Sequence, residues 1–279
     1  MSDDDRDGTN EDRRIAVLGG GNIGRALARG WARSGVRRPE EITVTRRQVD
    51  RLETMAAEGF RVTGDNRAAV SSARTVVLAV QPQQVVELLE EIRPALDPGR
   101  HLLVSVVSDV TVGDLQGRLG APVQVVRAMP NTAIAIGESM TCLAAAEGAG
   151  EALAEARELF DAVGETLVIR EDLMVAATAL VACGVAFFLR AIRAASQGGI
   201  EIGFHPEDAL ALAAQTARGA AGLLQREGGH PESEVDKVTT PRGCTIAGLN
   251  EMEHQGFSSA LIKGITVSAR KAAELYQEG

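Results

Sequence analysis

The residues with the most specific spacing are three glycines near the amino terminus, Gly19, Gly21 and Gly24, which fit the pattern G-x-G-x-x-G. They follow a short apolar run, Ile15–Leu18, and a helical pattern begins directly after them. In a strand–turn–helix unit the first glycine allows a tight turn, the second lets the backbone approach a pyrophosphate, and the third lets helix and strand pack closely. The N–H groups and positive dipole end of the helix then favour phosphate. The pattern predicts a dinucleotide-binding site.

The end of the second predicted strand, Ile42–Thr45, bears on the type of dinucleotide. A site that prefers NAD usually places an acidic residue there to hold the ribose 2′-hydroxyl. This chain instead has Arg46 and Arg47, and no acid before Asp50. One or both arginines could pair with the 2′-phosphate of NADPH, and the alternative is two solvated surface arginines. We expect NADPH as the cofactor, with NADH as an alternative.

The composition limits the classes of function. The 279-residue chain is long enough for two domains, and its formal net charge of −9 argues against nucleic acid or an anionic membrane as the main partner. Its three cysteines are scattered and odd in number, which favours a reducing compartment, and neither they nor the four histidines have metal-ligand spacing. The acidic residues 1–13 are expected to be a disordered tail rather than a signal peptide. We therefore expect a cytoplasmic protein with no metal site.

A strand–helix rhythm over residues 14–170 provides the elements that would position the site. Continuous apolar strands between amphipathic helices are typical of a parallel sheet that is covered on both faces. The sequence therefore predicts an α/β fold with a Rossmann-type dinucleotide-binding domain over 14–170. The further predicted strands are 61–63, 76–80, 102–107, 123–127, 140–145 and 166–169, and the predicted helices include 49–57, 85–92, 112–119 and 151–163.

From residue 171 onward the pattern is almost entirely helical, which predicts a second, all-α domain over 171–279. Residues 173–189 contain no charge and reach the lower limit of length for a membrane span. Their Ala and Gly content and the soluble domain before them favour instead a helix that is buried on all sides, in a domain core or a dimer interface. Further helices are predicted over 190–200, 206–226, 231–238 and 257–276.

The second informative segment, 238–249, lies between these helices and reads VTTPRGCTIAGL. It resembles the C-terminal signature loop of the pyrroline-5-carboxylate reductases, S-P-G-G-T-T or S-P-G-G-A-T, and Thr240, Pro241, Gly243 and Thr245 fall on matching positions. The similarity covers nearly the whole chain, and its segments occur in the family's order. The other segments that carry it are 19–24 with Asn22, Asp65-Asn66, Ala79-Val80-Gln81-Pro82, RAMPNT at 127–132, Gln215-Thr216 with Gly219-Ala220, and 251–257.

The resemblance implies an all-α dimerisation domain after the Rossmann-type domain, and a homodimer or a larger ring of dimers. It implies hydride transfer from the nicotinamide to the C=N carbon of 1-pyrroline-5-carboxylate, which gives L-proline in the last step of proline biosynthesis. The imine can enter protonated, so a dedicated general acid is not required. By resemblance, the catalytic contact is Thr245, the substrate-binding residues are Thr240, Pro241, Gly243, Cys244 and Thr245, and the cofactor-binding residues are Gly19, Gly21, Asn22, Ile23, Gly24, Arg46, Arg47, Asn66, Ala79, Val80, Gln81 and Pro82.

The signature loop also has a physical reason to bind an anion. A loop that ends in a helix after Pro241 offers backbone N–H groups and a helix dipole to the substrate carboxylate. The Thr245 hydroxyl can hydrogen-bond the ring nitrogen or the carboxylate. From spacing alone, Thr240 and Thr245 would be interpreted as helix-capping residues. The family match favours the substrate contact.

The chain departs from the family pattern at several positions. Arg242 replaces a glycine of the signature loop, and Ser108-Asp109 replaces Ala-Gly. Arg242 is tolerated if its φ is negative, or it adds a cation beside an anionic substrate. The remaining departures are Cys244 for Ala or Thr, Gln81 for Lys, and Ala182-Cys183-Gly184-Val185 for G-S-G-P.

Two other functions stay open. Another imine or hydroxyacid reductase with the same two domains would commonly use a lysine of the helical domain, for which Lys237 and Lys263 are candidates. The other alternative is a non-catalytic relative that binds NADPH, and Arg242 is the residue that favours it. A substrate panel tests the first alternative, and NADPH binding without imine-dependent oxidation would indicate the second.

Overall fold

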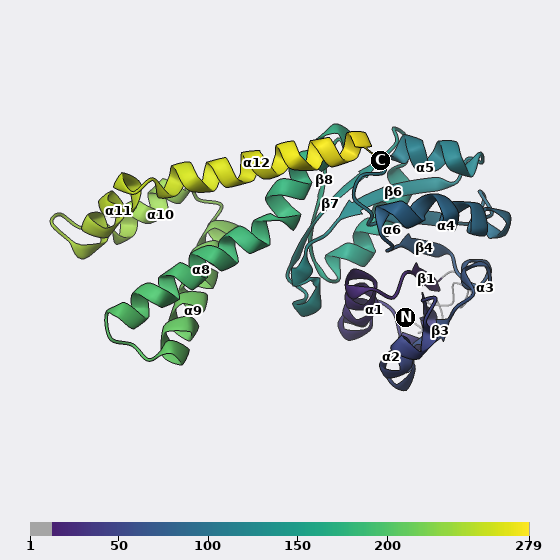
Figure 1. The fold of residues 1–279 in the computed structure, drawn as a ribbon, viewed down its shortest axis with the longest axis horizontal. Coiled ribbons are helices and arrows are strands. Elements are labelled where there is room, and N and C mark those ends of the chain that lie inside the picture. Colours follow the sequence, from purple (N-terminus) through teal and green to yellow (C-terminus); the bar gives the residue numbers. More distant parts are fainter. Residues whose placement is uncertain (1–12, 279) are drawn as a thin grey trace, which may run out of the picture. The chain divides into compact units, whose positions relative to one another are not determined.

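The computed structural model describes residues 13–278, so of the predicted tail over 1–13 only Arg13 lies within the described residues. The strands form one sheet in the order β3-β2-β1-β4-β5-β6-β7-β8 (Figure 1). The predicted Rossmann-type α/β fold is confirmed, and the predicted strands differ from the observed ones by at most two residues at either end. The strands are β1 Ile15–Leu18, β2 Ile42–Thr45, β3 Arg61–Thr63, β4 Thr75–Leu78, β5 Leu102–Ser105, β6 Gln124–Met129, β7 Ser139–Ala145 and β8 Gly164–Val168.

Helices cover both faces of the sheet, because successive strand residues point to opposite sides. In β1, Ile15 and Val17 belong to one core cluster, and Ala16 and Leu18 belong to another. The first cluster includes apolar residues of α1 (Asn22–Ser34), α2 (Glu53–Ala57, after the 3-10 turn Val49–Leu52) and α6 (Gly150–Asp161), and the second includes those of α3 (Asn66–Ser71), α4 (Val85–Ile92) and α5 (Val112–Leu119).

One edge of the sheet differs from the predicted all-parallel arrangement. β7 runs antiparallel to β6, with Met129 opposite Cys142, and then pairs in parallel with β8. Residues 130–138 connect β6 to β7 and contain only the short 3-10 helix η6 (Thr132–Ile136). Parallel neighbours need a crossover of a dozen or more residues, so this short connection dictates an antiparallel pair.

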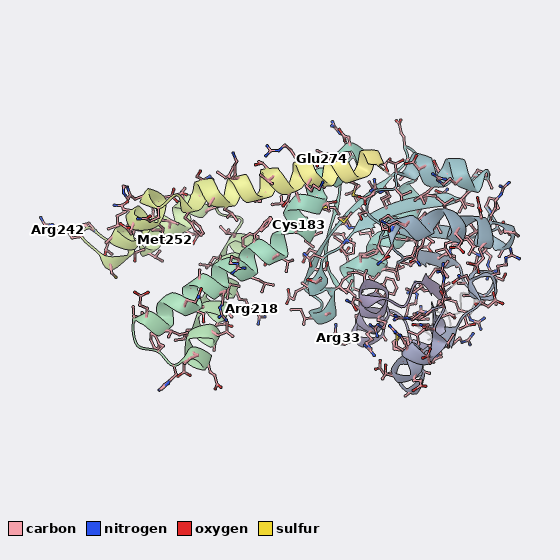
Figure 2. The ribbon with its side chains drawn as sticks, viewed as in Figure 1. Arg33, Cys183, Arg218, Arg242, Met252 and Glu274 are labelled. Atoms are coloured by element: carbon pink, nitrogen blue, oxygen red, sulfur yellow. The ribbon has the colours of Figure 1, made fainter. Side chains whose placement is uncertain are left out.

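The chain falls into two compact units. The first contains the sheet and its helices up to Ala182 together with the chain from Ala269, and the second is Cys183–Ser268. The boundary predicted after residue 170 stays a prediction. Cys183 directly precedes α8 (Figure 2), and α8 packs tightly on α9, where a Cβ added to Gly199 would lie 3.1 Å from Ala209 Cβ. The helices from Cys183 onward are α8 Gly184–Glu201, α9 Pro206–Glu227, α10 Pro231–Val238, α11 Cys244–His254 and α12 Phe257–Glu278.

The apolar segment 173–189 is helical as predicted, but it is not one regular α-helix. It contains α7 (Met174–Ala177), the π-helix η8 (Thr178–Ala182) and the first turns of α8, which continues through the helix predicted over 190–200. The Thr178 hydroxyl donates to the Met174 carbonyl oxygen at 2.9 Å, a back-bond that competes with the α-helical ladder.

Exposure decides between the alternatives for this segment. Leu180 is 56% exposed and Phe188 is 59% exposed, so the domain-core alternative is wrong and the interface alternative stays a prediction. By length and composition alone, Glu171–Glu201 could cross a membrane, with 22% of its most apolar window buried. High apolar content and low burial are also expected of a helix surface that another protein chain covers.

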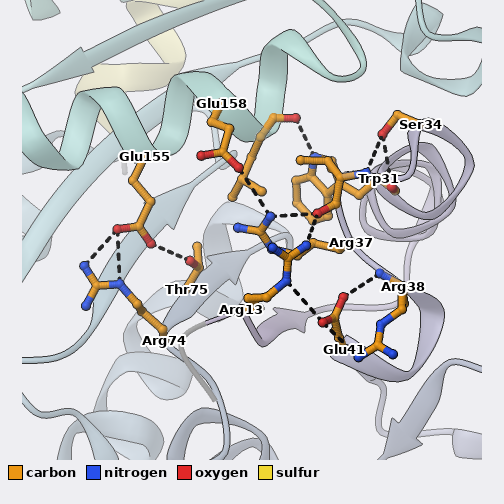
Figure 3. Close-up of polar contacts among 12 residues, drawn as sticks. Arg13, Trp31, Ser34, Arg37, Arg38, Glu41, Arg74, Thr75, Glu155 and Glu158 are labelled. Atoms are coloured by element: carbon orange, nitrogen blue, oxygen red, sulfur yellow. Dashed lines mark hydrogen bonds and ion pairs between the residues drawn. The ribbon is translucent and has the colours of Figure 1, made fainter. Parts of the chain in front are cut away.

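Polar contacts hold α1 and α6 beside the amino-terminal ends of the parallel strands (Figure 3). Glu155 of α6 accepts hydrogen bonds from Thr75 Oγ1 and from Arg74 Nη2, each at 2.9 Å. The buried Trp31 of α1 donates its indole N–H to the Leu159 carbonyl oxygen at 2.7 Å. These contacts stabilise one end of the sheet and leave the carboxyl end for binding.

Candidate functional site

The turn after β1 has the geometry that its glycines predict. Gly19 has a φ of 115°, and a Cβ there would lie 2.4 Å from the Ala79 carbonyl oxygen. A Cβ at Gly24 would lie 2.1 Å from the Gly19 carbonyl oxygen, so α1 begins this close to β1 only because residue 24 has no side chain. Gly21 has no atom within 4 Å of such a position, and it is the N-cap of α1 without a side-chain cap. Among the described residues, no side chain caps the N–H groups at the start of α1, so they are available to a ligand.

A cavity of about 490 Å³ lies in the first unit, where β1, β2 and β4 end. The strand order reverses between β1 and β4, and open α/β sheets bind ligands at such a switch point. The backbone of the glycine turn, the polar end of β2 and one face of α4 surround the cavity. Its lining is Gly19, Gly20, Gly21, Thr45, Arg46, Arg47, Gln48, Asn66, Ala79, Val80, Gln81, Gln84, Glu87, Leu88 and Glu91.

Both arginines at the end of β2 line the cavity, but their contacts differ. Arg46 donates from Nη1 to the Gly20 carbonyl oxygen at 2.8 Å, which ties it to the glycine turn. Arg47 Nη2 lies 2.9 Å from Glu87 Oε2, and the two side chains are 73% and 76% exposed. Among the described residues, the Arg46 side chain thus hydrogen-bonds only a backbone carbonyl, and the Arg47 side chain forms an ion pair with α4.

Asn66, the first residue of α3, connects β2 to α4 across the cavity wall. Thr45 Oγ1 donates to Asn66 Oδ1 at 2.6 Å, and Asn66 Nδ2 donates to Glu91 Oε2 at 3.0 Å. Asp65 caps α3 by accepting from the Ala68 N–H at 2.9 Å. These hydrogen bonds hold the Asn66 amide and the Glu91 carboxylate at the polar wall of the cavity, where both groups can hydrogen-bond sugar hydroxyls.

The cavity brings together eight of the predicted cofactor residues and leaves four at its border. Asn22, Ile23 and Gly24 form the first turn of α1, and Pro82 begins the 3-10 helix η4 (Pro82–Gln84). Sequence reasoning missed seven lining residues, Gly20, Thr45, Gln48, Gln84, Glu87, Leu88 and Glu91. Thr45 and Gln48 adjoin the arginines, and Gln84, Leu88 and Glu91 share one helix face by their spacing. The signal that could have found them is a helix that starts just after β4, at the switch point.

The 240–245 loop belongs to the second unit and leads into α11. Gly243 is the N-cap of α11, and no side chain of residues 13–278 caps this end, so the capping interpretation of Thr240 and Thr245 is wrong for this helix. A Cβ at Gly243 would lie 2.4 Å from Thr240 Oγ1 and 3.0 Å from the Thr240 carbonyl oxygen, so a larger residue there would require the Thr240 side chain to move. Cys244 and Thr245 are the first helical residues, and within the described chain no group hydrogen-bonds the Thr245 hydroxyl. The loop therefore offers N–H groups and one hydroxyl to a ligand.

Comparison with known proteins gives the family. Residues 171–275 match the family model described as pyrroline-5-carboxylate reductase dimerisation, and residues 14–109 match that described as NADP oxidoreductase coenzyme F420-dependent. Pyrroline-5-carboxylate reductase 2 of Dictyostelium discoideum is 45% identical over 278 residues, which cover 94% of this chain and 93% of that protein. The chain belongs to the pyrroline-5-carboxylate reductase family.

Two further reductases of the family extend the comparison. Pyrroline-5-carboxylate reductase 1 of Dictyostelium discoideum is 48% identical over 96% of this chain, which spans only 50% of that protein. A crystal structure of the Plasmodium falciparum pyrroline carboxylate reductase with NADP bound has a TM-score of 0.85 at 22% identity and covers 95% of this chain and 99% of its own. The family resemblance is confirmed, and the reductase fold extends over nearly the whole chain.

Two of the departures from the family pattern lie in left-handed backbone. Asp109 has a φ of 64° and Arg242 has a φ of 59°, and no other described non-glycine residue has a positive φ. Each stands where the family pattern has glycine. The φ of Arg242 excludes the first alternative, in which a negative φ makes the arginine tolerable, and the alternative of a cation beside an anionic substrate stays a prediction. The exposed Arg242 side chain points outward from the loop between α10 and α11 (Figure 2). Burial raises the pKa of Asp109, which the Ser108 hydroxyl and the charge of Arg127 oppose.

The part of the chain that matches the dimerisation model leaves large apolar side chains exposed. Ile202, Val238 and Ile262 are 78%, 61% and 63% exposed. Exposed large apolar side chains that gather on one surface mark sites of contact with other proteins. Together with the matched model, this exposure indicates that this reductase forms homo-oligomers.

Proposed function

We propose that the protein reduces 1-pyrroline-5-carboxylate to L-proline, with NADPH as the hydride donor. The observation that carries the proposal is the cavity at the β1/β4 switch point, with its bare glycine turn, in a chain that shares 45% identity with a named pyrroline-5-carboxylate reductase over nearly all of both. The two halves of the reaction need a dinucleotide site and an anion site. The first unit supplies features of the former and the signature loop supplies features of the latter.

The cavity fits a dinucleotide by three features. Gly21 leaves space beside the uncapped start of α1, which suits a pyrophosphate. Arg46 and Arg47 provide cations for a 2′-phosphate, and Asn66 provides an amide for the adenosine ribose. NADPH supplies the hydride when it is bound, and the protein's part is to hold it in position. NADH would use the same site without the 2′-phosphate contact.

The signature loop is proposed to bind the substrate carboxylate. The N–H groups of Gly243, Cys244 and Thr245 and the dipole of α11 favour an anion at this end. The Thr245 hydroxyl is available to hydrogen-bond the ring nitrogen or the carboxylate, which fixes the orientation of the imine ring. Hydride addition to a protonated imine gives the amine without a further proton, so the residues need only bind and orient.

We propose a homodimer, which larger rings can include, in which the helices of the second unit cover one another's apolar surface. The exposed residues Phe188, Leu189 and Ile202 support this assembly. We also propose the cytoplasm as its compartment, because scattered cysteines in odd number suit a reducing environment. For the hydroxyacid alternative, Lys237 offers little support, since its ammonium pairs with Glu234 at 2.7 Å.

The test is NADPH oxidation with purified protein and 1-pyrroline-5-carboxylate, compared with piperideine-2-carboxylate and a panel of hydroxyacids. We expect turnover to be fastest with the five-membered imine, and proline as the product. Faster turnover of a different substrate would assign the protein to another reductase activity. Tight NADPH binding with no turnover of any imine would make it a non-catalytic member.

A further inference from the structure

The lining of the proposed cofactor cavity includes two carboxylates. Both belong to α4, so the residues around β2 do not predict them. Glu87 and Glu91 lie one helical turn apart on α4 and line the same cavity as Arg46 and Arg47. The formal charges of the lining therefore cancel. A pocket built only to hold a phosphate dianion would carry an excess of positive charge.

The two carboxylates are held in different ways. Glu91 is half-buried and accepts from Asn66 Nδ2 at 3.0 Å, so a neutral amide fixes it. Glu87 is 76% exposed, and its carboxylate lies 2.9 Å from Arg47 Nη2. Arg46 is held to the Gly20 carbonyl oxygen and faces no carboxylate among the ion pairs of the described chain. Glu87 thus occupies the one arginine that is not tied to the glycine turn.

We infer that Glu87 sets the cofactor preference of this site by competing with the 2′-phosphate of NADPH for Arg47. This inference rests on the proposed function, in which the dinucleotide binds in this cavity. A 2′-phosphate carries nearly two negative charges, so it has to displace Glu87 from Arg47 and then lies close to a like charge. NADH has only a hydroxyl at that position, which Glu87 does not repel. Glu87 therefore lowers the affinity for NADPH and leaves the affinity for NADH unchanged. The site then prefers NADPH over NADH by a smaller factor than it would without Glu87.

The test uses Glu87→Gln, which removes the charge and keeps the size of the side chain. Dissociation constants of NADPH and NADH are measured by cofactor fluorescence without imine, and those of 2′,5′-ADP and 5′-AMP by calorimetry. We expect NADPH and 2′,5′-ADP to bind about 3- to 10-fold more tightly, the scale of one exposed ion pair together with the relieved repulsion. NADH and 5′-AMP should keep their wild-type affinities, and high salt should shrink the gain.

The matched control is Glu90→Gln, the same change on the same helix at an exposed position outside the cavity lining. It should change none of the four constants. In an Arg47→Ala background, Glu87→Gln should give a smaller gain than in the wild type, because the competition for Arg47 is gone.

Two results separate failure of this inference from failure of the proposed function. If wild-type protein binds NADPH and Glu87→Gln changes both cofactors equally or neither, the assignment to Glu87 is wrong and the proposed function stands. If wild-type protein binds neither dinucleotide nor either adenosine fragment, the cavity is not a dinucleotide site and both fail.

Discussion

The two units of this reductase bury their residues to very different extents. The three core clusters found among the described residues lie in the first unit, where Trp31, Leu27 and Phe160 have no exposed surface. In the second unit, among the residues whose exposure the structure describes, only Gly184, Ser196 and Ala209 are buried. Hydrophobic burial is the main favourable term in folding. The first unit therefore has a core of its own, and the second depends on surface that another copy of the chain would cover.

The two units also have different functions in the proposed enzyme. The rigid sheet of the first unit presents the dinucleotide cavity, and the helices of the second present the signature loop and the apolar surface. Changes in the first unit should therefore alter cofactor binding and leave assembly intact. Changes in the second should alter assembly or imine turnover and leave the cofactor site intact.

The largest effect is expected from Phe188→Glu in α8. A charge placed in an apolar interface loses the burial of the ring and is desolvated without a partner, which we estimate at about 3 kcal/mol or more per copy. A two-fold interface contains the change twice. Sedimentation equilibrium at micromolar concentration should show the wild type as a dimer or larger and the variant as a monomer.

The control for this change is Val86→Glu on α4 of the first unit, where the side chain is 41% exposed and lies outside the cavity lining. It should change stability by no more than about 0.5 kcal/mol and leave assembly as in the wild type. A monomeric wild type, or a Phe188→Glu variant that sediments like the wild type, would remove the distinction between the two units.

The next largest effect is expected from the double substitution of Arg46 and Arg47 by alanine. Each lost charge-assisted contact with the 2′-phosphate is worth roughly 1.5 kcal/mol, so the NADPH Michaelis constant should rise about a hundredfold. The Michaelis constant for NADH should change little. Steady-state kinetics with both cofactors measures this, and equal behaviour of variant and wild type would make the arginines plain surface residues.

A smaller effect is expected from Thr245→Ala in the signature loop. It removes one hydroxyl and keeps the backbone donors, so turnover of the imine should fall about 10- to 100-fold. NADPH binding should stay near the wild-type value, and since Gly243 is the N-cap of α11, unfolding should change by less than about 1 kcal/mol. Equal losses in rate, cofactor affinity and stability would instead indicate that the loop has lost its structure.

The smallest effect is expected where glycine replaces a residue with left-handed backbone, once in each unit. Arg242→Gly should raise the free energy of unfolding by up to about 1 kcal/mol, because a Cβ no longer clashes with the backbone at a φ of 59°. Asp109→Gly should gain less, because aspartate tolerates this conformation better than arginine. Urea unfolding of both variants measures the difference. A loss of stability in Arg242→Gly would show that its side chain makes a favourable contact.

Much of the first unit follows from local sequence. Neighbouring residues determine where a strand, a tight turn and a helix begin. The apolar runs of β1 and β4 and the turn at Gly19 were therefore predictable from the sequence around them. Local sequence does not predict the place of Glu87, because α4 reaches the cavity only through the order of the strands in the sheet. The π-helix at Thr178 also lacks a local signal, because its apolar pattern suits an ordinary helix equally well. The antiparallel β7 could have been predicted from the short connection after Met129.

The last helix has a consequence for the order in which the chain folds. α12 starts at Phe257 in the second unit, yet from Ala269 onward it belongs to the first unit, where Ala272 is 8% exposed. Synthesis proceeds from the amino end, so the sheet emerges from the ribosome well before these residues. Closing a contact over so long a separation slows folding more than it alters stability. The strands of the sheet are therefore synthesised before the residues from Ala269 onward that complete the first unit.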